Sequence, residues 1–151
     1  MQPYRGGHNR DLKTPSLRAD ERVRARMRAQ RERDTAMERQ IRSRLHAMGL
    51  RFRLHQRLLT GLRREADVVF ARARVAVFID GCFWHGCPEH GTWPKNNAVF
   101  WRRKLRANAT RDRDTDARLA ADGWVVVRVW EHERADQAAI RIAEVVAARA
   151  T

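Results

Sequence analysis

The chain has 151 residues, of which 43% are apolar, so it suits a single domain with one core. Its 32 Lys and Arg residues against 18 Asp and Glu residues give a net charge of +14. A compact chain this basic favours a polyanionic partner, which we expect to be nucleic acid rather than acidic lipid. No stretch approaches the roughly 20 apolar residues of a membrane span. Without an apolar signal core, we expect a cytoplasmic protein with reduced cysteines and no membrane partner.

The first part of the chain is predicted to be a basic arm. Residues 1–20 contain two glycines and two prolines and show no apolar period. Residues 21–33 form an arginine-rich run, which we expect to become helical only against DNA. The expected division is therefore an N-terminal arm at 1–33 and a folded domain at 34–151.

The folded part is predicted to begin with a helix that Thr35 starts and Gly49 ends. Thr35 and Glu38 have the spacing of a capping box, and glycine suits the left-handed position after a helix. This capping role is enough to explain why a glutamate occupies position 38, although a role of Glu38 in a functional site stays open. Apolar residues recur at helical spacing between these ends: Met37, Ile41, Leu45 and Met48.

Three short strands are predicted next, at residues 52–55, 66–70 and 75–80. The second and third are close enough in sequence to form a hairpin. Asp67 comes directly before three apolar residues of the second strand. Its carboxylate is either an ordinary strand-edge charge or a ligand for a hard cation such as Mg²⁺.

The second half is predicted to hold a long helix at about 97–122, a strand at 124–130 and a final helix at about 136–149. The strand is apolar apart from Arg128, as expected of a strand buried on both faces. The complete order is αβββαβα, which indicates one α/β domain.

One face of the long helix combines apolar and polar residues. Asn108 and Asp112 lie near the middle of this stripe, where polar groups need partners or a cavity with water or metal. A hydrogen bond to a neighbouring strand and a functional site both fit. The stripe consists of Trp101, Leu105, Asn108, Asp112, Thr115 and Leu119.

The loop after the third strand carries both cysteines of the chain. With two nearby histidines and a distant one, it offers five candidate ligands for a four-coordinate zinc site. An irregular loop with little apolar content needs a bound metal to hold one conformation. The alternative is two free thiols and scattered histidines. Spacing alone does not decide which ligand is left over among Cys82, His85, Cys87, His90 and His132.

Several segments then match one known family in order and at compatible spacing. They are RDTAME at 33–38, AD at 66–67, DGCFWH at 80–85, FW at 100–101, Asn108, RDR at 111–113, GW at 123–124 and VWEH at 129–132. In these residues the chain resembles the very short patch repair endonucleases, bacterial enzymes that act on T·G mismatches. The resemblance covers roughly residues 24–132 and implies a restriction-endonuclease-like core, with a mixed sheet flanked by helices.

The resemblance also implies an active site. In it, Asp67 binds catalytic Mg²⁺ with the backbone carbonyl of Ile79 nearby. His85 acts on the attacking water, which leaves it out of the zinc site. Glu38 and Asp112 hold metal-bound waters.

The remaining implied roles concern zinc and DNA. Cys82, Cys87, His90 and His132 become the four zinc ligands. Aromatic side chains can wedge between base pairs, although some of them are also expected to cover the zinc. Phe83, Trp84 and Trp101 would enter the base stack from the major groove and Met27 from the minor groove. Asn108 and Arg111 complete the expected DNA-binding residues.

The function expected from the resemblance is a Mg²⁺-dependent nick on the 5′ side of the T in a T·G mismatch. A monomer is expected, together with functional links to a DNA cytosine methyltransferase and to mismatch-repair proteins. The alternatives are a zinc-dependent DNA-binding module without catalysis and a restriction-type nuclease with another DNA target. The joint presence of Asp67, His85 and Glu38 favours an enzyme.

Overall fold

The computed structural model describes residues 21–22, 25, 35–82, 87–89 and 97–150. The chain divides into two units, residues 1–31 and 32–151, and the fold given below is that of the second. Its elements confirm the predicted order αβββαβα. They are α2 (Ala36–Ala47), β1 (Arg53–Arg57), β2 (Glu65–Phe70), β3 (Val75–Asp80), α3 (Ala98–Ala121), β4 (Val125–Trp130) and α4 (Ala135–Arg149).

Helix α2 begins and ends where its sequence predicts. The Thr35 hydroxyl accepts a hydrogen bond from the amide of Glu38 at 3.3 Å, which satisfies one of the unpaired donors of the first turn. Gly49 follows the helix with φ of +79°, a left-handed conformation that glycine adopts without strain. Ile41 and Leu45 are fully buried, so the apolar stripe of α2 faces the core.

The four strands form one mixed sheet in the order β1-β2-β3-β4. The β1–β2 and β2–β3 pairs are antiparallel, and the latter is the predicted hairpin. Strand β4 pairs with β3 in parallel because the chain returns through α3 before entering it. The pairing of these two strands brings Asp80 opposite Trp130, and their ends lead into the segments that carry Cys82 and His132.

Strand β4 differs from the prediction that both its faces are buried. It lies at an edge of the four-stranded sheet, and only Val127 and Val129 are buried along it. Strand β3 has the buried pattern instead, with Val75, Ala76 and Val77 fully buried. An apolar run therefore did not distinguish a central strand from an edge strand, because either can pack against helices.

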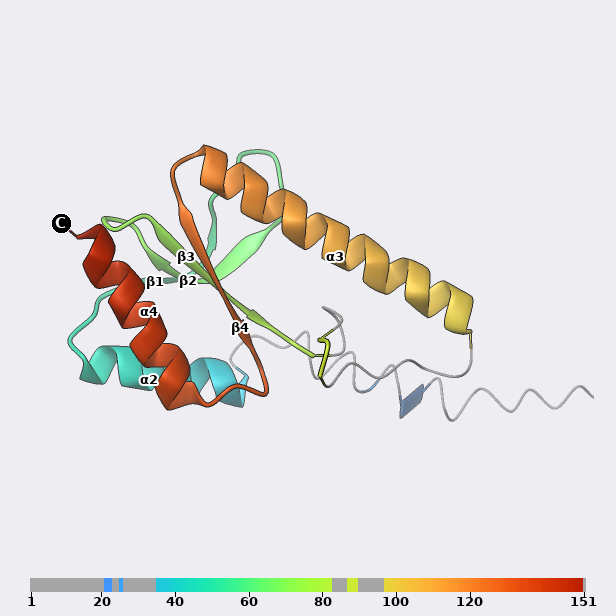
Figure 1. The fold of residues 1–151 in the computed structure, drawn as a ribbon, viewed down its shortest axis with the longest axis horizontal. Helices are drawn as coiled ribbons and strands as arrows, with labels where there is room; N and C mark the ends of the chain where they lie inside the picture. The colour runs from blue at the N-terminus through green and yellow to red at the C-terminus, as the bar shows by residue number, and fades with distance from the viewer. Residues whose placement is uncertain (1–20, 23–24, 26–34, 83–86, 90–96, 151) are drawn as a thin grey trace, which may run out of the picture. The chain divides into compact units, whose positions relative to one another are not determined.

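Helices cover both faces of the sheet (Figure 1). Helices α2 and α4 pack against each other on one face, where a core cluster includes Ile41, Val77 and Ile142. On the other face Leu119 of α3 packs with a second cluster that includes Phe78. None of the described helices combines the length and apolar character that crossing a membrane requires.

Candidate metal centre and active site

Three predicted metal ligands meet where β3 and β4 end. The Nδ1 atom of His132 lies 3.1 Å from Sγ of Cys82 and 3.5 Å from Sγ of Cys87. All three ligand atoms lie within 4.8 Å of one another, and both cysteines are buried. The topology explains this meeting, since the parallel pairing of β3 with β4 brings both chain segments to the same end of the sheet.

The geometry of this cluster fits a tetrahedral metal. Zinc bonds of about 2.3 Å to sulfur and 2.0–2.1 Å to nitrogen place neighbouring ligand atoms about 3.6 Å apart. The Cys87–His132 distance of 3.5 Å agrees with this value, and the Cys82–His132 distance of 3.1 Å is somewhat shorter. The group of Cys82, Cys87 and His132 can therefore hold a metal ion.

Neighbouring side chains support the cluster. Oε1 of Glu131 accepts a hydrogen bond from the amide of Cys82 at 2.9 Å, and the amide of Glu131 donates to the carbonyl of Asp80 at 2.9 Å. Oε2 of Glu89 lies 3.5 Å from Nε2 of His132, the ring nitrogen that does not face the sulfurs. A carboxylate in this place orients a metal-binding imidazole and sets its tautomer.

The electrostatics of Cys82 also suit a cation. The pKa of the Cys82 thiol is raised to about 12. The largest cause is burial, followed by the hydrogen bond and charge of Cys87 and then by the charge of Glu131. The thiol alone is therefore protonated at neutral pH. A bound cation would attract both sulfurs and so favour their thiolate forms. Its binding would release the proton of the Cys82 thiol.

Asp67 lies on β2 and bonds to β3. Its Oδ2 atom accepts a hydrogen bond from the amide of Ile79 at 2.7 Å. Ile79 is three residues before Cys82 in the chain, so the carboxylate and the metal cluster are anchored to the same stretch of β3. This contact uses the amide of Ile79, whereas the role that the resemblance implies for Ile79 uses its carbonyl.

Two further predicted site residues lie on helices. Glu38 of α2 is only 7% exposed, so its carboxylate lies inside the fold in addition to its place in the cap. Asp112 of α3 is half-buried, and Oδ1 lies 3.9 Å from a guanidinium nitrogen of Arg128. Burying a carboxylate costs free energy unless it has hydrogen-bond or charge partners. Glu38 and Asp112 are therefore stronger candidates for a site than carboxylates on the surface.

The polar and apolar stripe of α3 faces the interior as predicted. Trp101, Leu105, Thr115 and Leu119 are buried and the two polar residues between them are half-buried. Oδ1 of Asn108 accepts a hydrogen bond from the exposed Arg111 at 3.5 Å. Trp101 is 8% exposed and packs edge-on against Phe100, which is 56% exposed. Insertion of Trp101 into a base stack would thus require its release from this packing.

Arg128 is the functional candidate that the sequence did not single out. Its guanidinium donates to both carboxylate oxygens of Asp80 at 3.0 and 2.9 Å and to Asp116 at 2.7–3.0 Å. It also stacks on Phe78, with 4.6 Å from Cζ to the ring centre. Burial alone would lower the pKa of Arg128, yet Asp116 and Asp80 raise it well above its usual value. A single Arg in an apolar strand was the only signal of this cluster.

Five predicted site residues lie outside the described residues. Their expected roles are therefore carried by the sequence alone. They are Met27, Phe83, Trp84, His85 and His90.

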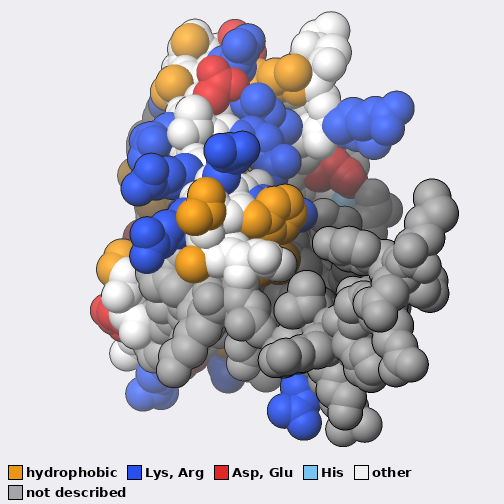
Figure 2. Space-filling model, turned by 90° about the vertical axis from the view of Figure 1, so that its right-hand side faces the viewer, with side chains coloured by type: hydrophobic (Ala, Val, Ile, Leu, Met, Phe, Trp, Pro, Cys, Tyr) orange, Lys and Arg blue, Asp and Glu red, His pale blue; other side chains and the backbone are white. Residues whose placement is uncertain are grey.

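Basic side chains are prominent on the face shown in Figure 2, where they lie beside apolar side chains in its described part. Helix α3 contributes exposed arginines at 102, 103, 106, 111 and 113, along with the exposed Val99 and Phe100. Lys104 lies over the rings of Phe100 and Trp101, with its Nζ 5.9 and 5.8 Å from the ring centres. A surface of guanidinium groups and aromatic rings is typical of nucleic-acid binding.

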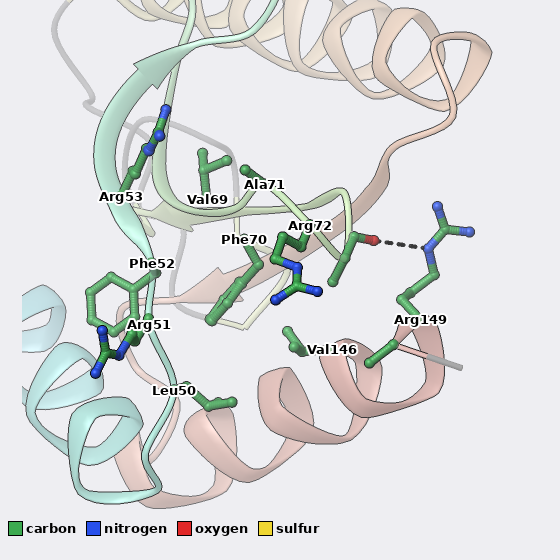
Figure 3. Close-up of a pocket in the computed structure, with 12 residues that line it drawn as sticks. Leu50, Arg51, Phe52, Arg53, Val69, Phe70, Ala71, Arg72, Val146 and Arg149 are labelled. Carbon is green, nitrogen blue, oxygen red and sulfur yellow. Dashed lines mark hydrogen bonds between the residues drawn. The ribbon is translucent and has the colours of Figure 1, made fainter.

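A separate pocket of about 650 Å³ lies at the opposite end of β3 (Figure 3). Residues 50–53, the turn between β2 and β3 and the end of α4 line it. Arg149 lies at its edge and donates a hydrogen bond to the carbonyl of Ala73 at 3.1 Å. Within the described part of the chain, none of the predicted site residues lines this pocket, and the length of β3 separates it from the metal cluster by roughly 17 Å. This hollow is therefore distinct from the candidate active site.

Comparison with known proteins identifies the family. The sequence profile described as DNA mismatch endonuclease Vsr matches residues 14–90. The chain belongs to the Vsr family. The matched residues include Glu38, Asp67, Cys82 and Cys87, which are four of the predicted site residues.

Similarity to individual known proteins agrees with this. The chain is 44% identical to the type II nicking enzyme V.NaeI of Lentzea aerocolonigenes, over 78% of this chain and 72% of that protein. It is 43% identical to the type II nicking enzyme V.XorIIP of Xanthomonas oryzae pv. oryzae, over 80% and 87%. It is 38% identical to DNA mismatch endonuclease Vsr of Escherichia coli, over 70% and 66%. As a Vsr-family protein the chain is an endonuclease that acts on DNA, so the alternative of a binding module without catalysis is set aside.

Proposed function

We propose that the protein makes a Mg²⁺-dependent single-strand nick on the 5′ side of the T in a T·G mismatch and so initiates very short patch repair. The observation that carries this proposal is the joint anchoring of Asp67 and the Cys82 cluster to the end of β3 in a Vsr-family chain. A divalent cation held by a carboxylate can polarise a phosphoryl oxygen and activate a bound water.

The metal of the cluster is proposed to be structural zinc. Two thiolates and an imidazole are soft and borderline ligands, which zinc prefers and Mg²⁺ does not. Cys82, Cys87 and His132 supply three ligands, and His90 is proposed as the fourth. A closed site of four protein ligands holds a loop in one shape and leaves no position for substrate.

Asp67 is proposed to hold the catalytic Mg²⁺, together with the carbonyl of Ile79. Carboxylate and carbonyl oxygens are the hard ligands that this ion requires, so the residues fit it. When bound, Mg²⁺ polarises the phosphoryl group and stabilises charge on the leaving oxygen. The hydrogen bond from Ile79 keeps the Asp67 carboxylate in one orientation on the sheet. Glu38 and Asp112 are proposed to hold waters of the ion.

His85 is proposed to take the proton from the attacking water. Histidine suits this step because its pKa lies near neutral pH, so it can accept a proton in one step and return it in the next. The family resemblance makes His85 the candidate ligand that is left out of the zinc site, which would leave its imidazole available for this role. Its position two residues before the second cysteine keeps it within the loop that the zinc holds.

Recognition of the mismatch is proposed to depend on unstacking. The side chains proposed to insert between base pairs are Phe83, Trp84 and Trp101 from the major groove and Met27 from the minor groove. Their insertion unstacks the bases, which costs a few kcal/mol per base step. A mismatched pair stacks and pairs weakly, which lowers that cost. Asn108, Arg111 and the exposed arginines of α3 would hold the flanking backbone.

The remaining proposals concern organisation. Residues 1–33 are proposed to form an arm that binds DNA, attached to an endonuclease domain at 34–151 that works as a monomer in the cytoplasm. A DNA cytosine methyltransferase is the proposed companion, since deamination of its product creates T·G. A functional link to mismatch-repair proteins is proposed for the same reason.

One nicking assay tests the proposed function. Duplexes that differ only in T·G, T·A or C·G at one position are placed in a panel of flanking sequences, with Mg²⁺ or with chelator. We expect a nick on the thymine strand of T·G duplexes only when Mg²⁺ is present. The relatives named type II nicking enzymes favour one competing function, a restriction-type nuclease with another DNA target. Equal nicking of matched and mismatched duplexes in one flanking sequence would establish that function instead.

A further inference from the structure

Arg128 joins two elements that carry different parts of the candidate active site. It belongs to β4, and its partner Asp80 is the last residue of β3, directly after the Ile79 that bonds to Asp67. Its other partners, Asp112 and Asp116, lie one turn apart on α3. A continuous series of contacts thus leads from Asp67 through β3 and Arg128 to Asp112.

The contacts of Arg128 are well suited to fixing a position. The Arg128 side chain is 23% exposed and that of Asp80 only 6%, so this pair is shielded from solvent. The planar guanidinium uses NH1 for Asp80 and Nε with NH2 for Asp116, and NH2 also donates to the carbonyl of Asp112 at 3.4 Å. Such a rigid fork sets orientation as well as distance, which a lysine ammonium cannot do.

The position of α3 relative to the sheet matters for the metal. Asp67 is held within the sheet by a backbone hydrogen bond, but Asp112 is on a helix that reaches the sheet through side chains. If the two carboxylates act on one ion and its waters, their separation must be constant. Side chains that orient the ligands of an ion typically change its affinity 10–100-fold when they are removed.

We propose that Arg128 is a positioning residue for the catalytic metal site, where it fixes Asp112 on α3 relative to Asp67 and the end of β3. This inference rests on the proposed function, because it takes Asp67 and Asp112 as the groups that face the ion and its waters. Arg128 contacts protein groups, so its proposed role is to position Asp112 and not to bind substrate or metal. Arg128 carries one positive charge and its three aspartate partners carry three negative charges, so the cluster has a net negative charge that favours a cation nearby.

A matched control lies on the same helix. NH1 of Arg64 donates to Oδ2 of Asp114 at 2.5 Å and to the hydroxyl of Thr115 at 3.0 Å, so Arg64 also attaches α3 to the rest of the domain. The Arg64 side chain is 21% exposed, close to the 23% of Arg128, and Asp114 and Asp116 are 40% and 37% exposed. Of these two arginines, Arg128 is the one that contacts Asp112 and the end of β3. If Arg128 served only to attach α3 to the domain, substitution of Arg64 and substitution of Arg128 should therefore have the same effect on the metal site.

The first experiment compares Arg128→Lys, the double variant Asp80→Asn/Arg128→Met, and Arg64→Lys with the wild type, all loaded with zinc. The double variant removes the arginine together with the charge of its buried partner Asp80, so no buried carboxylate loses its guanidinium partner at that position and the fold is expected to be retained. Nicking of a T·G duplex is measured over a range of Mg²⁺ concentrations. We expect the Mg²⁺ concentration at half-maximal rate to rise at least ~10-fold in both Arg128 variants and to change less than about 2-fold in Arg64→Lys.

The second experiment does not depend on activity. Binding of Mn²⁺ to the zinc-loaded proteins is followed by the electron paramagnetic resonance of the free ion, with Asp67→Asn defining the background. The Asp67-dependent affinity is expected to fall at least ~10-fold in Arg128→Lys and to stay unchanged in Arg64→Lys. Zinc content should be the same in all variants, which separates this effect from damage to the metal cluster.

The outcomes distinguish this inference from the proposed function. A wild-type protein that nicks without any divalent cation would overturn both. If the wild type requires Mg²⁺ but folded Arg128 variants keep its half-maximal concentration and its Mn²⁺ affinity, Arg128 is only structural and the inference fails alone. The inference also fails alone if Arg64→Lys shows an equal loss.

Discussion

The amide of Cys82 donates a 2.9 Å hydrogen bond to Oε1 of Glu131, across 49 residues of sequence. This contact joins the loop that carries both cysteines to the turn that carries His132. It holds Cys82 close to His132 before any metal arrives, since one partner is the backbone of Cys82 and the other precedes the histidine by a single residue. The amide of Cys87 donates to the carbonyl of Cys82 at 3.0 Å, which keeps the third ligand near the first. The cluster is therefore preorganised by the pairing of β3 with β4.

The first prediction concerns zinc. Cys87→Ser should lower zinc from one ion per chain to near zero and reduce the melting temperature, because a closed site loses a ligand. Elemental analysis of purified protein and thermal unfolding check this. His46→Gln is the control, since this histidine packs on Phe52 away from the cluster. A Cys87→Ser protein with full zinc content would refute the ligand assignment.

The second prediction separates binding from catalysis at Asp67. Asp67→Asn should reduce Mg²⁺-dependent nicking below detection while DNA affinity stays the same or increases, because a carboxylate that repels phosphate is removed. Gel-shift and nicking assays measure the two effects. His85→Ala should lose at least ~10²-fold in rate, the usual scale for a general acid or base. Asp136→Asn, a change at an exposed residue paired with Arg134, should leave both quantities unchanged. Zinc loss in His85→Ala would instead make His85 a ligand.

The third prediction tests the buried pair of Arg128 and Asp80. Arg128→Met alone leaves the buried Asp80 carboxylate without its main partner, which should lower the free energy of unfolding by about 3 kcal/mol. The double variant Asp80→Asn/Arg128→Met should lose less stability, because residue 80 then carries no buried charge that has lost its guanidinium partner. Urea unfolding of the zinc-loaded proteins measures both. An equal or greater loss in the double variant would contradict this explanation.

The fourth prediction is a pH dependence that involves Asp114. Hydrogen bonds from Arg64 and then Arg118 hold the pKa of Asp114 below its usual value of 3.8. A depressed pKa contributes stability above about pH 4, and the contribution is lost as the pH falls through the lowered value. Asp114→Asn should therefore melt below the wild type at pH 7, with the difference shrinking below pH 4. The Asp114 side chain is 40% exposed, so solvent screens its charge and the effect on stability is small. A difference that grows towards acid would have the wrong sign.

The fifth prediction concerns the basic arm. Affinity for a matched duplex should fall steeply as salt rises, because arginine contacts release counterions from DNA. Deletion of residues 1–26 should flatten the plot of log affinity against log salt while the remaining domain keeps its zinc and its melting transition. Fluorescence anisotropy at several salt concentrations gives the slopes. An unchanged slope would show that the arm does not touch DNA.

Local sequence determined the elements of this protein. Thr35 and Gly49 fix the ends of α2 through hydrogen bonding and backbone conformation, which depend on neighbours within four residues. The stripe from Trp101 to Leu119 shows which face of α3 is buried because a helix repeats regularly. Residue chemistry likewise made Cys82, Cys87 and His132 three of the five candidate metal ligands, since few side chains can bind a soft cation.

Only the tertiary structure decided which of these elements became neighbours. Strand β4 is apolar enough to be central, yet it is an edge strand, because strand order depends on the crossover through α3. Arg128 looked like an interruption of that strand, but its partners lie 48 and 12 residues away on β3 and α3. Periodicity describes one element at a time and contains no information about contacts between elements. The charged cluster that joins Asp80 to Asp112 therefore became visible only once β3, β4 and α3 were packed together.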